Sequence, residues 1–115
     1  MSDLDESVLA RLKEDIGGDE AILRDLVETF ESEGRKLLAD LRAGVAQLDV
    51  FHRAAHTLKS TSATMGAPRL SGLAKQLEAE ARMGRVENPG PRVEALATEF
   101  DRTVVQLRAF VGGLK

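Results

Sequence analysis

Apolar residues recur along this chain at intervals of three or four, which is the spacing of one face of an α-helix. Regular alternation of apolar and polar residues, the pattern of a half-buried strand, is nearly absent. The longest apolar stripe predicts a helix over about 20–46, and it consists of Ile22, Leu23, Leu26, Val27, Phe30, Leu37, Leu38, Leu41 and Val45. A shorter stripe of Val8, Leu9 and Leu12 predicts a first helix over about 7–15.

Glycine, proline and aspartate residues divide the rest of the pattern into separate helices. Gly17 and Gly18 fit the end of the first helix, and Asp19 is a candidate N-cap of the second, because its carboxylate can accept free N–H groups of the first turn. Asp49 is a candidate cap of a third helix for the same reason. Breakers at Gly66-Ala67-Pro68 and Asn88-Pro89-Gly90-Pro91 then predict helices over about 50–65, 68–83 and 91–111.

Four long helices with short links, each carrying one apolar stripe, predict an all-α fold. We expect an up-and-down antiparallel four-helix bundle, with the short additional N-terminal helix covering one end. A length of 115 residues is typical of one domain, so residues 1–115 are expected to form a single domain.

Composition and charge exclude several functions. The chain has no Cys, which excludes a disulfide framework, a thiolate metal site and a cysteine nucleophile. A net charge of −3 gives little reason to expect nucleic acid as a partner. No apolar run approaches the roughly 20 residues that cross a bilayer, and the acidic start is unlike a signal peptide. We therefore expect a cytoplasmic protein without a membrane partner, and the even distribution of charge favours a monomer.

The third helix has one face that does not look like packing. At 100° per residue its core stripe contains Phe51, Ala54, Ala55, Leu58, Ser62 and Met65. His52, His56, Lys59 and Ala63 fall roughly 80–140° away from that stripe, and Ser60 lies opposite it. Small side chains at Ser60 and Ala63 leave His56 accessible to another protein, while Lys59 places a positive charge within reach of an anion on the ring. An accessible imidazole beside an ammonium suits a nucleophile that accepts a phosphoryl group.

At these residues the sequence resembles a known family. The stretch AHTLKSTSATMGA, residues 55–67, resembles the active helix of histidine-containing phosphotransfer (HPt) domains of bacterial two-component phosphorelays, whose pattern is approximately A-H-x-L-K-G-S-[SA]-x-x-[LM]-G-[AL]. Ile16-Gly17-Gly18-Asp19 before a long helix with Phe30 is also similar, as is Leu77-Glu78 followed by Ala79 and Ala81. The resemblance covers about residues 5–110.

The resemblance implies a role for each matching residue. His56 would accept the phosphoryl group through its outer ring nitrogen, Lys59 would stabilise the phosphate charge, and Glu78 would orient the ring. Ser60 departs from the pattern, since the family commonly has Gly there, and it could either crowd the partner or donate a hydrogen bond to phosphate. His52, Arg53, Ser60 and Ala63 would belong to the partner-docking surface.

The resemblance also implies the activity and the partners. The protein would be a stoichiometric phosphocarrier, not an enzyme, that takes a phosphoryl group from a receiver-domain aspartate and relays it to another receiver. Its partners would be response-regulator receiver domains and a hybrid histidine kinase. It would hold no cofactor, no metal and no ATP, because Mg²⁺ would reside on the receiver.

Three alternatives remain open at this point. The chain could be an adaptor that inhibits a receiver or kinase while His56 is idle, or the phosphoacceptor domain of a chemotaxis-type kinase, which requires a kinase core after Lys115. A metal site is the third, because His52 and His56 have the i, i+4 spacing of helical zinc ligands. However, the Glu of H-E-x-x-H is missing and no third ligand follows, unless Glu78 or Asp49 serves.

Overall fold

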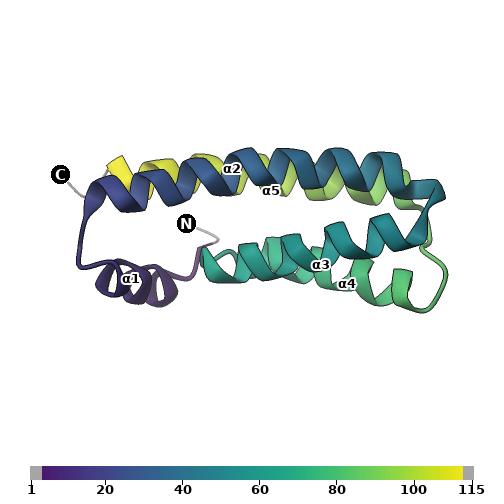
Figure 1. Ribbon diagram of the computed structural model, residues 1–115, viewed down its shortest axis with the longest axis horizontal. Helices are drawn as coiled ribbons and strands as arrows, with labels where there is room; N and C mark the ends of the chain where they lie inside the picture. Colours follow the sequence, from purple (N-terminus) through teal and green to yellow (C-terminus); the bar gives the residue numbers. More distant parts are fainter. Residues whose placement is uncertain (1–3, 113–115) are drawn as a thin grey trace.

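The computed structural model describes residues 4–112, which form a helical bundle without strands in that range. The helices are α1 (Glu6–Asp15), α2 (Glu20–Ala43), α3 (Leu48–Thr64), α4 (Pro68–Arg82) and α5 (Pro89–Gly112), with a 3-10 turn at Gly44–Ala46. The predicted all-α class is confirmed. From α2 onwards, successive helices run in opposite directions along the long axis (Figure 1).

The four long helices pack in a closed ring of neighbours. Contacts join α2 to α3, α3 to α4, α4 to α5, and α5 back to α2, so α3 and α5 are diagonal to each other. Helices α2 and α5 have 24 residues each, whereas α3 has 17 and α4 has 15. At 1.5 Å per residue the first pair is longer by more than about 10 Å. The short helix α1 lies beyond the end of α3 and α4, alongside this overhang (Figure 1).

Helix α1 is attached at the turn that follows α3. The N–H of Asp5 donates to the carbonyl of Gly66 at 2.7 Å, and Leu9 is buried. Gly66 has a φ of 71°, and a Cβ there would lie 3.0 Å from the carbonyl oxygen of Asp5. Glycine therefore satisfies both the left-handed backbone and the close approach of α1.

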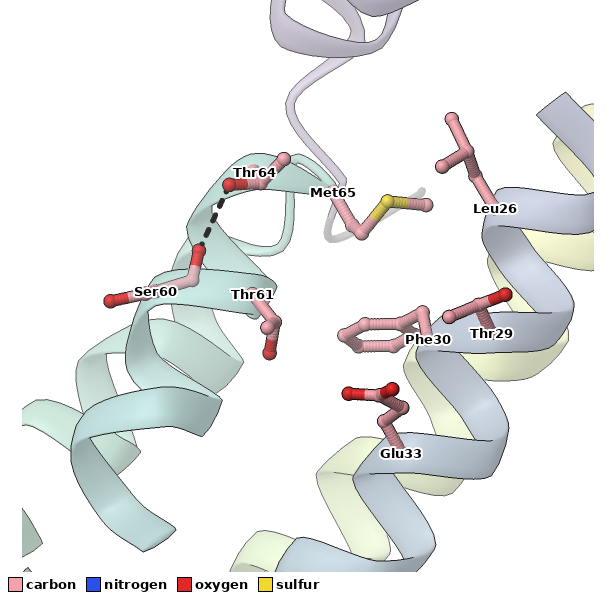
Figure 2. A pocket seen from close by; sticks show the side chains of 8 residues that line it. All are labelled: Leu26, Thr29, Phe30, Glu33, Ser60, Thr61, Thr64 and Met65. Carbon is pink, nitrogen blue, oxygen red and sulfur yellow. Dashed lines mark hydrogen bonds between the residues drawn. The ribbon is translucent and has the colours of Figure 1, made fainter. Parts of the chain in front are cut away.

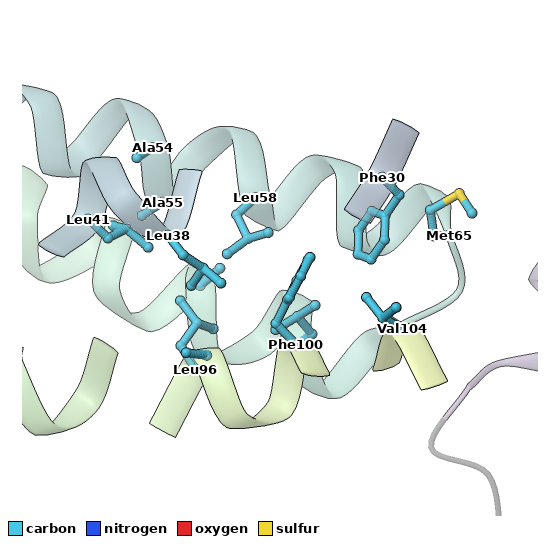
Figure 3. Packing of buried hydrophobic residues seen from close by; sticks show 14 of the residues in the cluster. Phe30, Leu38, Leu41, Ala54, Ala55, Leu58, Met65, Leu96, Phe100 and Val104 are labelled. Carbon is cyan, nitrogen blue, oxygen red and sulfur yellow. The ribbon is translucent and has the colours of Figure 1, made fainter. Parts of the chain in front are cut away.

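The core is a column of leucine, alanine, valine and phenylalanine side chains between the helices (Figure 3). Phe100 of α5 is fully buried, and its ring lies 5.3 Å from that of Phe30, centroid to centroid. On α2, the backbone at Gly34 approaches Phe100 so closely that a Cβ at this position would overlap the ring. The guanidinium carbon of Arg35 lies 5.0 Å from the centroid of the same ring. Phe100 is thus confined on several sides.

Several expected element ends are confirmed and others are wrong. Asp19 caps α2, because its carboxylate accepts the N–H groups of Ala21 and Ile22. Asp49 is not a cap: α3 begins at Leu48, its N-cap is Gln47 without a side-chain hydrogen bond, and Asp49 lies in the first turn. The cause is the earlier end of α2, where Gly44 packs directly against the backbone of Phe51 and the chain turns.

The burial of two residues and the ends of two helices also differ from what the apolar pattern predicts. Val45 lies in the 3-10 turn and Ile22 in the first turn of α2, and both are more than 40% exposed (43% and 44%). Helix α3 ends at Thr64, one residue before the expected Met65. Helix α5 begins at Pro89 instead of Pro91, because prolines fit a first turn whose N–H groups need no partner within the helix. Gly112, expected to end this helix with Gly113, is its last helical residue, whereas Gly113 lies outside the described range.

A charged contact joins α4 to the start of α5. Arg92 donates to both carboxylate oxygens of Glu80, at 2.6 and 2.5 Å, and the N–H of Glu87 donates to the same carboxylate at 3.2 Å. The Arg92 hydrogen bonds, with help from the Glu87 N–H, lower the pKa of Glu80 from 4.5 to about 2. The ionised carboxylate therefore favours the folded chain.

We expect Arg92→Gln to lower the urea midpoint of unfolding at pH 7. The difference between its midpoint and that of the unaltered chain should decrease as the pH falls. A group whose folded pKa is lowered contributes stability above its unfolded pKa, and this is lost as the pH falls through the folded value. The stabilisation is therefore lost between about pH 4.5 and about pH 2. Arg85→Gln is the control, because Arg85 forms no ion pair within residues 4–112. An Arg92→Gln effect that persists unchanged at pH 2 contradicts this account.

Candidate functional site

His56 lies in the middle of α3, with its ring at the surface and its inner nitrogen on a buried carboxylate. The side chain is 56% exposed, and Nδ1 is hydrogen-bonded to Oε2 of Glu78 in α4. Glu78 itself is only 4% exposed in its side chain. The contact forms because the core faces of α3 and α4 pack together, through residues such as Leu58 and Leu77. The outward position of His56 agrees with the helical pattern.

Lys59 occupies the other oxygen of the same carboxylate. Its ammonium donates to Oε1 of Glu78 at 2.7 Å, and its side chain is 28% exposed. Arg82, one turn after Glu78 in α4, lies 3.7 Å from Oε1. The hydroxyl of Ser71 donates to the Lys59 carbonyl at 2.9 Å, which adds a second link between α3 and α4. Glu78 is thus shared between a ring and an ammonium.

The charge on Glu78 decides which ring nitrogen of His56 carries a proton. The hydrogen bond from Lys59 lowers the pKa of Glu78 most, burial opposes this, and the hydrogen bond from His56 lowers it further. An ionised carboxylate only accepts hydrogen bonds, so Nδ1 of His56 must carry a proton and donate it. In neutral imidazole the lone pair is then on Nε2. Within residues 4–112, Nε2 has no hydrogen-bond partner.

His52 is less exposed than the helical pattern predicts. It is half-buried, and its Nε2 is buried without a hydrogen-bond partner in the part of the chain described. Its ring lies 6.4 Å from that of His56, centroid to centroid, with an interplanar angle of 14°. A fully outward-facing His52 is therefore not found. Over residues 4–112, no three His, Asp or Glu side chains gather in a way that could hold a metal ion.

The other predicted docking residues lie along α3. Arg53, Ser60 and Ala63 are all exposed. Ser60 borders a pocket between α2 and α3 (Figure 2), which is lined by Leu26, Thr29, Phe30, Glu33, Ser60, Thr61, Thr64 and Met65. The carbonyl of Ser60 accepts from the Thr64 hydroxyl at 3.1 Å. The structure thus places the predicted docking side chains on one helix, and it adds Glu33 and Phe30 of α2, which the sequence analysis did not consider for the site.

The residues that sequence reasoning missed are those brought in by packing. Ser71 and Arg82 contact the site from α4, and both are ordinary polar residues in the sequence. A helical wheel of α4 could have found Arg82, since it follows Glu78 by four residues and shares its face. For Ser71 no signal in the sequence indicates a bond to the backbone of another helix.

This bundle, with an exposed imidazole held by a carboxylate from the next helix, is the architecture of a histidine phosphotransfer domain. The family model described as "Hpt domain" matches residues 25–108. The chain therefore belongs to the Hpt domain family and is a histidine phosphotransfer protein of phosphorelays. Proteins of this family are phosphocarrier intermediates that interact with receiver domains and kinases.

A solved structure supports the same classification. The chain is similar to histidine-containing phosphotransfer protein B (HptB) from Pseudomonas aeruginosa PAO1, with 28% identity and a TM-score of 0.84. The match covers 95% of this chain and 94% of that one. Among curated protein sequences there is no significant match. No helix within residues 4–112 is both long and apolar enough to cross a membrane.

Proposed function

We propose that His56 accepts a phosphoryl group on Nε2 from the aspartyl phosphate of a receiver domain and passes it to an aspartate of another receiver. The single observation that carries this proposal is the bond between Nδ1 of His56 and the ionised, buried Glu78. It leaves the lone pair on Nε2, and the exposed ring presents that nitrogen to a partner. His56 is thus the nucleophile of the family's reaction in this chain.

The transfer is an exchange of one bond for another. The lone pair of Nε2 attacks phosphorus, an N–P bond forms, and the P–O bond to the receiver aspartate breaks. The electron pair of that bond stays on the leaving carboxylate. The imidazole retains its Nδ1 proton and gains positive charge, which the carboxylate of Glu78 stabilises through the hydrogen bond already in place. The same steps in reverse deliver the group to the next receiver.

Lys59 and Glu78 support this reaction in different ways. Glu78 fixes the tautomer and the orientation of the ring, in the way that a carboxylate orients a metal-bound histidine. Lys59 is held on Glu78, and its flexible side chain can also reach the phosphoryl oxygens on the ring. The chain would be a stoichiometric carrier in the cytoplasm, with Mg²⁺ supplied by the receiver and no cofactor of its own.

The test is to locate the phosphoryl group. We expect the chain, incubated with phosphorylated receiver domains, to acquire phosphate that is labile in acid and stable in base. In ¹⁵N-labelled protein, the ¹⁵N spectrum should assign the N–P bond to Nε2 of His56. Before transfer, the same spectrum should report a proton on Nδ1. Phosphate on Nδ1, on His52 or on a carboxylate contradicts the proposal.

Two variants of Glu78 separate orientation from charge in that experiment. Glu78→Gln keeps an oxygen that can accept from Nδ1 but removes the charge, so we expect the tautomer to persist and transfer to slow. Glu78→Ala removes the acceptor, so the Nε2-protonated tautomer should rise and transfer should slow further. Equal tautomer populations in both variants and in the unaltered chain mean that Glu78 does not orient the ring.

A further inference from the structure

Helix α3, which carries His56, lies between two surface hollows. His56, Ser60 and Ala63 follow one another at intervals of four and three residues along α3. Ser60 borders the pocket toward α2, whose apolar floor includes Phe30 and which Figure 2 views from close by. Ala63 borders a second hollow toward α4 and α1. A partner that reaches His56 therefore covers surface on both sides of α3.

The surface on the α2 side is acidic. Glu33 lines the pocket beside Ser60, and it also lines another hollow along α2, together with Asp25, Glu28 and Lys36. Neither Asp25 nor Glu33 has an ion-pair partner within 4.0 Å among residues 4–112. This hollow is thus lined by three carboxylates and a single ammonium.

The surface on the α4 side is basic. Lys75 lines the hollow beside Ala63 and forms no ion pair in the described range. Arg82 is 65% exposed, and its nearest carboxylate is Glu78 at 3.7 Å. The acidic group at the far end of this hollow, Asp5, accepts from the N–H and hydroxyl of Ser7 and so caps α1.

On another side of the bundle, several opposite charges are paired. The side formed by α2 and α5 has ion pairs of Arg35 with Asp101, Arg42 with Glu94, and Arg108 with Glu31. These pairs neutralise charge on that side, whereas Asp25, Glu33 and Lys75 form no ion pair within residues 4–112. Unpaired charges of opposite sign therefore lie on the two sides of His56. They can orient a bound partner across α3 through complementary charges.

We infer that the receiver domain served by His56 has basic groups that face α2, acidic groups that face α4, and apolar side chains that enter the pocket between α2 and α3. This inference rests on the proposed function. In this arrangement charge fixes the direction in which the receiver lies across α3, so a receiver with one sign of charge over the whole contact is disfavoured. Like charges placed opposite each other in an interface suppress wrong partners.

The test neutralises one charge on each side. We use the receiver that charges the unaltered chain, and we measure the second-order transfer rate constant for Glu33→Gln and Lys75→Gln. Both should lower it by about two- to fivefold at low salt, and both effects should shrink as salt screens the charges. The controls are Val105→Lys and Val105→Glu, which change the net charge by the same amounts at a 67% exposed position on α5, the helix diagonal to α3. They should leave the rate constant nearly unchanged.

The outcomes distinguish this inference from the function on which it rests. Opposite effects of Glu33→Gln and Lys75→Gln indicate a partner of uniform charge and overturn the inference, as does the absence of any effect from either. In both cases His56 still takes up phosphate. If the unaltered chain takes phosphate from no phosphorylated receiver, the proposed function itself is wrong. Matching thermal midpoints of all four variants would exclude a folding defect as the cause.

Discussion

Replacing His56 with Gln is expected to abolish uptake of phosphate from phosphorylated receiver domains, a loss of at least about a hundredfold, because the reaction then lacks its nucleophile. Gln is similar in reach, and its amide can still occupy the surface of α3, so the fold should persist. The measurement is transfer of labelled phosphate from the receiver to the chain. The matched control is His52→Gln, which removes the other imidazole and leaves His56, Lys59 and Glu78 in place. That variant should still accept phosphate.

The His56→Gln variant also tests the adaptor alternative. If the chain acts by binding and inhibiting a receiver or kinase, His56→Gln should inhibit as well as the unaltered chain. If it acts as a carrier, the variant should bind the receiver and fail to draw phosphate from it. Normal phosphate uptake by His56→Gln would show that His56 is not the phosphoryl acceptor, whatever the effect on binding.

Gly34→Ala is expected to destabilise the fold by roughly 1–3 kcal/mol, although alanine has a higher helix propensity than glycine. The added methyl would overlap the ring of Phe100, which is fully buried against Phe30 and beneath Arg35. The ring cannot move away without disturbing this packing, so α2 and α5 must separate. The free energy of unfolding from urea titration is the measurement.

The control is Gly72→Ala in α4, an exposed helical position where a Cβ meets nothing within 4 Å. It should stabilise the fold by roughly 0.5–1 kcal/mol through helix propensity alone. In a Phe100→Leu background, Gly34→Ala should cost less, because a smaller side chain leaves room for the methyl. A stabilising Gly34→Ala in the unaltered background is incompatible with the close approach of α2 to α5.

Local signals in the sequence predicted the helices better than their ends. Asp19 follows two glycines and precedes a long apolar stripe, so its capping role could be read directly. Asp49 has the same chemistry, yet the buried contact between Gly44 and Phe51 ends α2 early and lets α3 begin before it. That contact is tertiary, and hydrophobic spacing contains no information about it. Gly34 is similar: its reason is a ring 66 residues away.

The site was predictable only as far as one helix defines it. The wheel of α3 places His56 outside the core, which the structure confirms, and the family resemblance selected Glu78 from a second helix. The wheel put His52 outside too, but it cannot include the neighbouring helix that half-buries this ring. Nor could spacing reveal that Lys59 binds Glu78, because the contact needs both helices in place.

The bond between His56 and Glu78 also depends on how α3 and α4 are aligned along their length. Each residue advances a helix by about 1.5 Å, and a hydrogen bond tolerates only a few tenths of an ångström. A slip of α4 by a single residue along α3 therefore suffices to detach the ring from its carboxylate. Core side chains such as Leu58 and Leu77, which never meet a phosphoryl group, thereby set the register on which the proposed nucleophile depends.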